Sequence, residues 1–144
     1  MFELKTASYW NLCYKEQSLK QYKIRSWSES NYILSNYINT LISGNPDKGW
    51  FEWTTEKYLP YKPYERALVL GCGCGNIERH AFILGLFEHI DAIDISKTAI
   101  QEAINQSREY GYFDKVSYRC QNFLSVNIPQ DTYDVVYMDM TLHH

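Results

Sequence analysis

Three glycines at alternate positions carry the first chemical signal of the chain. Gly71, Gly73 and Gly75 follow directly on an apolar run, residues 67–70, within the segment RALVLGCGCGNIERH. Glycine reaches positive φ at little cost and has no Cβ to keep a ligand away from the backbone. A helical pattern begins after the third glycine, so the unpaired N–H groups of a helix N-terminus face the loop. The spacing predicts a strand, a tight loop and a helix that bind a nucleotide-like ligand, with Cys72 inside the loop.

Two polar side chains are expected where the next two strands end. Asp94 lies 21 residues beyond Gly73, with Ile95 beside it, and Asn122 follows the third predicted strand, with Phe123 beside it. A carboxylate at the first of these positions can accept hydrogen bonds from both hydroxyls of a ribose. The alternative is that Asp94 only caps the following helix.

Acid-base chemistry has its candidates near the end of the chain. His143 and His144 follow the fourth predicted strand, and an imidazole titrates near neutral pH, so either could remove a proton from an acceptor. A structural role for the pair is equally open. Asp139 precedes them and could hold one end of the ligand or act as a base, and we favour the first role.

Strands that alternate with helices must position these residues. We expect strands at 67–70, 90–95, 116–120 and 133–138, one helix after Gly75, and a second helix that Ser96 caps and Gly111 closes. This alternation predicts an α/β fold with a doubly wound parallel sheet of about four strands. The carboxyl ends of such strands lie at one edge, so the candidate site residues are expected to converge there.

The N-terminal part of the chain has a different character. Residues 1–63 are rich in Tyr and Trp and are expected to be mostly helical, whereas 64–144 form the ligand-binding domain. One helix is predicted from near Ser28 to Gly44, and another over 50–58. The aromatic side chains of this segment either form a lid over a substrate pocket or pack on the sheet.

Composition limits the class of protein. The 144 residues are 45% apolar, enough for one core, and a net charge of -3 gives no footprint for nucleic acid or an anionic membrane. No apolar run could span a bilayer, and the start MFELK lacks the apolar region of a signal peptide. The four cysteines fit neither a disulfide framework nor a zinc site. We therefore expect a cytoplasmic protein with free thiols and no metal.

The order and spacing of these signals resemble the class I, Rossmann-like, S-adenosylmethionine-dependent methyltransferases. The resemblance runs over about residues 64–144 and includes the glycine motif, the acid that ends the second strand, the polar residue after the third, and YDVV shortly before LHH. It implies S-adenosyl-L-methionine as the cofactor and methyl transfer to oxygen or nitrogen of a small molecule. The implied cofactor-binding residues are Gly71, Cys72, Gly73, Gly75, Asp94, Ile95, Asn122, Phe123 and Asp139.

The chain departs from the family at two positions. Asn122 stands where the family often contacts adenine through Asp, and an Asn keeps a carbonyl acceptor while losing the charge. Val69 stands where many members carry an acid inside the first strand, so the loop lacks one familiar polar support.

Three other interpretations stay open. An NAD-dependent dehydrogenase is the most distant of them, because the NAD fingerprint has a glycine where this chain has Asn76. Aminopropyl transfer is nearer, since Asp139 stands where that family carries an acid, but Cys74 does not supply the acid usual in its loop. The resembling fold has seven strands, whereas this chain ends after four, so we expect a fragment. It could then be a non-catalytic cofactor-binding or interaction module, or inactive.

Overall fold

A computed structural model of the chain describes residues 2–19 and 30–141. Its elements are α1 (Phe2–Leu19), α2 (Asn31–Ile33), the π-helix η2 (Leu34–Asn39), α3 (Thr40–Ser43), α4 (Trp50–Tyr58), β1 (Tyr64–Leu70), α5 (Asn76–Ile83), β2 (Phe87–Asp94), α6 (Lys97–Glu109), the 3-10 helix η3 (Phe113–Lys115), β3 (Val116–Cys120), the 3-10 helix η4 (Phe123–Ser125) and β4 (Val135–Tyr137). The chain divides into two compact units, one with α1 and the sheet and the other with α2 to α4. The sequence-based division at residue 63 instead grouped α1 with the helical segment.

The sheet has four strands in the order β3-β2-β1-β4, and all neighbouring pairs are parallel. The strand order reverses at β1, where β2 lies on one side and β4 on the other. This arrangement confirms the predicted α/β fold with a Rossmann-like parallel sheet. In such sheets a ligand binds beyond the carboxyl ends of the strands, at the point of reversal.

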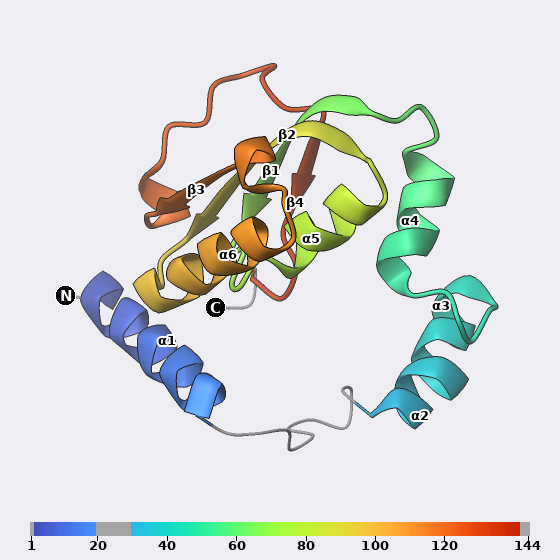
Figure 1. Cartoon of the computed structure of the whole chain (residues 1–144), viewed down its shortest axis with the longest axis horizontal. Coiled ribbons are helices and arrows are strands. Elements are labelled where there is room, and N and C mark those ends of the chain that lie inside the picture. The colour runs from blue at the N-terminus through green and yellow to red at the C-terminus, as the bar shows by residue number, and fades with distance from the viewer. Residues whose placement is uncertain (1, 20–29, 142–144) are drawn as a thin grey trace. The chain divides into compact units, whose positions relative to one another are not determined.

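The two faces of the sheet are covered differently. Helices α5 and α6 lie together on one face (Figure 1). On the other face Leu68, Leu70 and Ile93 form a small core. Four side chains pack on this core. Three come from the segment between β3 and β4, namely Phe123, Val126 and Tyr133, and the fourth, Met138, directly follows β4. Both faces are therefore apolar, which explains why β1 is a continuous apolar run without alternation.

The helix after β2 begins and ends where the sequence predicted. The hydroxyl of Ser96 accepts a hydrogen bond from the backbone N–H of Ala99 at 3.2 Å, as expected of an N-cap. Small apolar residues of α6, among them Ala99 and Ala103, are fully buried and allow the helix to lie close to the sheet. Gly111, with φ of 76°, follows the last turn.

Strand boundaries differ by a few residues from those expected. β1 begins earlier than predicted, because Tyr64 already pairs with Phe87 of β2. β4 is shorter than predicted, since its pairing with β1 starts only at Val135, opposite Ala67. The chain just before β4 makes a different contact, in which the backbone N–H of Asp134 donates to the carbonyl of Arg66 at 2.9 Å.

The second unit contains a continuous helical stretch, α2 to α3, and the separate helix α4. The first ends at Gly44, whose φ is 75°, as the sequence predicted, while its expected start near Ser28 lies outside the described residues. α4 has the predicted range, and the Glu52 carboxylate accepts a hydrogen bond from the N–H of Gly49 at its N-terminus, at 3.1 Å. The role of its aromatic residues as a lid stays a prediction. None of the helices described is long and apolar enough to cross a membrane.

Candidate cofactor site

The candidate residues that the structure describes follow the carboxyl ends of four parallel strands. The glycine loop follows β1, Asp94 ends β2, Asn122 follows β3 and Asp139 follows β4. The register places these ends side by side, since Leu70 pairs with Ile93, and Asp94 with Cys120. The structure thus brings to one edge those of the predicted site residues that it describes.

The glycine loop adopts the backbone conformation that its sequence favours. Gly71, Gly73 and Gly75 have φ of 72°, 55° and 81°, in the left-handed region where a side chain is disfavoured. The loop is also tied to the neighbouring strand, because the N–H groups of Gly71 and Cys72 both donate to the carbonyl of Ile93, at 2.8 and 3.1 Å. The start of the loop is therefore held by hydrogen bonds of the fold itself.

Asp94 connects this loop to the start of α6. One carboxylate oxygen, Oδ2, accepts the N–H of Gly73 at 2.9 Å, and the other, Oδ1, accepts the N–H of Ser96 at 2.7 Å. Burial raises the pKa of Asp94, and the backbone N–H groups of Ser96, Gly73 and Ile95 act in the opposite direction. Each oxygen of a carboxylate can accept about two hydrogen bonds. The carboxylate thus keeps capacity for a further donor, such as a hydroxyl of a ribose.

Two glycines of the loop lie so close to other residues of the chain that a Cβ would not fit there. A Cβ on Gly71 would lie 2.2 Å from the hydroxyl oxygen of Thr141. A Cβ on Gly75 would lie 3.0 Å from the Tyr118 hydroxyl and 3.2 Å from the Cβ of Ala103. The sequence suggested that glycine leaves room for a ligand, whereas at these two positions the space is filled by the chain itself.

The two cysteines of the loop, Cys72 and Cys74, have raised pKa values. Burial raises the pKa of Cys72 well above its ordinary value, and the nearby Glu78 and Asp94 raise it further. Burial likewise raises the pKa of Cys74 to about 11, with Glu102 adding to the effect. Both shifts favour the neutral thiol over the thiolate, which is the nucleophilic form of cysteine.

Asn122 and Phe123 make contacts within the chain that the sequence did not predict. The Asn122 side chain accepts the N–H of Leu124 at 3.0 Å and so caps η4. The ring of Phe123 packs on the core around Ile93. Ile95, half-buried beside Asp94, has its carbonyl 3.7 Å from the thiol of Cys120. The contact of Asn122 or Phe123 with adenine stays a prediction, as does the contact of Ile95 with the cofactor.

Asp139 and Thr141 follow the end of β4. Asp139 is exposed, and partial desolvation of its carboxyl raises its pKa. Its carbonyl accepts the hydroxyl of Thr141 at 2.9 Å, which also donates towards the carbonyl of Leu70 at 3.2 Å. His143 and His144, the predicted bases, lie outside the described residues.

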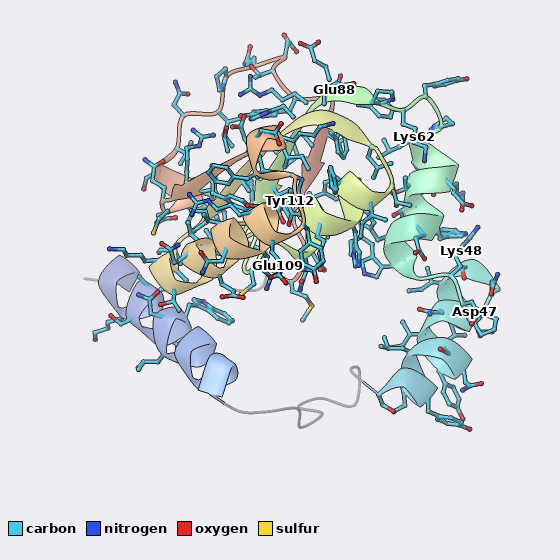
Figure 2. The ribbon with its side chains drawn as sticks, viewed as in Figure 1. Asp47, Lys48, Lys62, Glu88, Glu109 and Tyr112 are labelled. Atoms are coloured by element: carbon cyan, nitrogen blue, oxygen red, sulfur yellow. The ribbon has the colours of Figure 1, made fainter. Side chains whose placement is uncertain are left out.

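A buried carboxyl behind the loop was missed by sequence reasoning. Glu78, in the first turn of α5, is fully buried, and neither of its carboxyl oxygens has a hydrogen-bond partner. Burial raises its pKa to about 8, and Asp94 adds to this while Arg79 opposes it. The hydroxyls of Tyr112 (Figure 2) and Tyr118 are likewise buried without a partner. Glu78 lies three residues before Ala81 and so beside the apolar stripe of its helix, but this spacing alone does not signal that the carboxyl is buried.

Known proteins with a similar sequence profile or fold include methyltransferases. Residues 67–144, more than half of the chain, match the sequence profile of a family described as "Methyltransferase domain". The fold is similar to a geranyl diphosphate methyltransferase in complex with GPP and sinefungin, with 19% identity over 94% of this chain and 54% of that chain, at a TM-score of 0.60. It is also similar to an S-adenosylmethionine-dependent methyltransferase from Clostridium acetobutylicum, with 23% identity over 86% of this chain and 42% of that one, at a TM-score of 0.52.

The chain spans about half the length of these two solved structures. Among curated proteins no match to the chain is found.

Proposed function

We propose, from the premise that the chain belongs to the methyltransferase domain family, that it binds S-adenosylmethionine at the edge described above and takes part in methyl transfer to a small molecule. The family confirms the resemblance predicted from the sequence and implies the predicted cofactor, S-adenosyl-L-methionine. When bound, this cofactor supplies an electrophilic methyl group on a sulfonium. The protein then has to hold the cofactor and align an acceptor with that methyl group.

The observation that carries the proposal is the state of Asp94. Its carboxylate accepts the N–H of Gly73 in the glycine loop and the N–H of Ser96 at the start of α6, and it keeps capacity for a further donor. We assign the ribose hydroxyls to this side chain. The loop from Gly71 to Gly75, with Cys72, is assigned to the carboxylate end of the cofactor, which the N-terminus of α5 favours electrostatically.

The remaining cofactor contacts are assigned by position along the edge. Ile95, Asn122 and Phe123 follow β2 and β3, and we assign them to the adenine. Asp139 follows β4, on the other side of β1, and we assign it to the methionine end or the acceptor. His143 or His144 is proposed as the base where the acceptor needs to lose a proton.

For the acceptor we propose a small molecule methylated on oxygen or nitrogen. The chain carries a net charge of -3 and gives no electrostatic support for nucleic acid or an anionic membrane as the partner. One similar structure, of 19% identity, is named for a small molecule, geranyl diphosphate. We place the protein in the cytoplasm, in keeping with its four free thiols.

Calorimetric titration of S-adenosylmethionine and S-adenosylhomocysteine into the chain tests the cofactor. We expect binding that Asp94→Ala weakens at least tenfold, whereas Asp114→Ala, at an exposed position in η3, leaves it unchanged. Absence of binding at millimolar cofactor would contradict the proposal.

Transfer of a labelled methyl group to a metabolite extract tests the reaction. Turnover that disappears with Asp94→Ala supports a methyltransferase. Binding without turnover supports the alternative, a non-catalytic cofactor-binding module, and transfer of an aminopropyl group from the decarboxylated cofactor would identify an aminopropyltransferase.

A further inference from the structure

A side chain from the N-terminal helix completes the start of α6. The Oδ1 atom of Asn11, in α1, accepts two hydrogen bonds, from the hydroxyl of Ser96 at 2.8 Å and from the backbone N–H of Thr98 at 3.1 Å. Ser96 in turn accepts the N–H of Ala99. Two orphan N–H groups of the first turn of α6 are thus satisfied, one by the helix's own cap and one from a helix that lies 85 residues away in the sequence.

Ser96 is where three parts of the fold meet. Its hydroxyl donates to Asn11, its Oγ caps α6, and its N–H donates to Asp94 at 2.7 Å. Its side chain is fully buried, so it has no solvent to replace a lost partner. Removal of the Asn11 oxygen while α1 stays in place would leave the Ser96 hydroxyl and the Thr98 N–H without their acceptor.

The contacts continue to the glycine loop without a break. Asn11 holds Ser96, Ser96 holds one oxygen of Asp94, and the other oxygen holds the N–H of Gly73 at 2.9 Å. α1 therefore reaches the loop through an unbroken series of three hydrogen bonds, and not only through apolar packing. If a ligand orders the carboxylate of Asp94, the same bonds favour the docked position of α1.

We propose that Asn11 is a positioning residue of the cofactor site: it fixes Ser96 and through it the carboxylate of Asp94, so that docking of α1 and binding of S-adenosylmethionine are linked. This rests on the proposed function in so far as Asp94 contacts the cofactor. Linkage is reciprocal, so a cofactor that binds the ordered carboxylate also stabilises the docked helix.

The first test uses amide hydrogen exchange of the ligand-free chain and needs no cofactor. Asn11→Ala should speed exchange at the N–H groups of Gly73 and Ser96, because the acceptor of both, Asp94, is held less firmly. Asn11→Asp keeps an oxygen for both bonds and should restore slow exchange. Leu12→Ala removes an exposed side chain of the same helix and should leave both rates unchanged. Equal rates in Asn11→Ala and Leu12→Ala would overturn the proposal.

The second test measures the affinity for S-adenosylhomocysteine by calorimetry. Asn11→Ala should weaken binding about fivefold, the lower end of typical coupling between sites, and Leu12→Ala should not change it. In a Ser96→Ala background the further effect of Asn11→Ala should fall below about twofold, because the route through the hydroxyl is already broken. Unchanged affinity in Asn11→Ala, or the same loss in both backgrounds, would overturn the linkage. If the unmodified chain binds no cofactor, the proposed function fails, and the exchange rates alone decide whether Asn11 positions Asp94.

Discussion

The side chain of Thr141 fills the space in which Gly71 would carry a Cβ. An added Cβ would lie 2.2 Å from the hydroxyl oxygen and 2.7 Å from the methyl carbon of Thr141, both far inside normal contact distance. Thr141 follows β4 and Gly71 follows β1, so the two neighbouring strand ends interlock here. The glycine is needed for the packing of the edge as well as for its backbone conformation.

Gly71→Ala is therefore expected to destabilise the fold beyond the effect of backbone strain. A side chain in the left-handed region costs about 1 to 2 kcal/mol, and the overlap with Thr141 adds to it. Gly85→Ala is the matched control, since Gly85 has φ of 61° but nothing lies within 4 Å of its added Cβ. Urea unfolding should show a larger loss for Gly71→Ala, and Thr141→Gly should recover part of it. Equal losses at the two glycines would contradict the packing argument.

Asp94→Asn tests the charge on the carboxylate. The amide replaces one acceptor oxygen by a donor, which would then face a backbone N–H of Gly73 or Ser96. We expect affinity for S-adenosylhomocysteine to fall at least tenfold, while Asp114→Asn, in η3, has no effect.

The same side chain predicts a pH dependence of binding. Because burial raises the pKa of Asp94, the unmodified protein should lose affinity as pH falls through this raised pKa, and Asp94→Asn should not show that change. Calorimetry between pH 4 and 7 measures it. An unmodified protein whose affinity stays constant on acidification would contradict the assignment of the ribose to Asp94.

Much of the sheet and its edge could be predicted because local signals agreed with the fold. The apolar run before Gly71 and the cap at Ser96 act within a few residues, and both lie where the sequence predicted them. The position of Asp94 at the glycine loop followed from the parallel arrangement alone. Parallel strands bring their carboxyl ends together, so a strand pattern is enough to group the residues that follow each strand.

Other features could not be predicted because they depend on contacts between distant residues. Thr141 against Gly71 and Asn11 at Ser96 join positions 70 and 85 residues apart, and no local pattern signals either contact. The burial of Glu78 depends on what covers α5. A charged residue near an apolar stripe usually lies at its solvent edge, and only the packed structure shows that this one does not.

Tyr133 should stabilise the face of the sheet opposite α5 and α6. Its hydroxyl donates to Asp91 at 2.8 Å, and Arg66 donates to the same oxygen at 2.9 Å, while Asp91 is only 4% exposed. Tyr133→Phe removes one donor from a buried carboxylate, so we expect a loss of about 1 to 2 kcal/mol in the free energy of unfolding. Tyr110→Phe, at a residue 54% exposed, should change it by less than about 0.5 kcal/mol. Similar losses in the two variants would show that the hydrogen bond to Asp91 contributes little.

Glu78 should make the stability of the protein depend on pH. Its carboxyl has an ordinary pKa of 4.5, which applies when the chain is unfolded, and burial raises the pKa to about 8 in the folded protein. Between these values the folded state holds a proton that the unfolded state has released. The contribution of Glu78 to stability is therefore fully present below pH 4.5 and is lost as pH rises towards 8, by roughly 1 kcal/mol per pH unit.

Glu78→Gln removes this titration with little change of shape. Urea unfolding at several pH values between 5 and 8 should give a flatter dependence for Glu78→Gln than for the unmodified protein, with a difference that grows as pH rises. The comparison uses slopes, so a constant cost of burying the amide does not affect it. Glu88→Gln, at an exposed position in β2, should keep the slope of the unmodified protein. Parallel slopes for all three proteins would mean that the buried carboxyl titrates alike in the folded and unfolded chain, and burial would then have no effect on its charge.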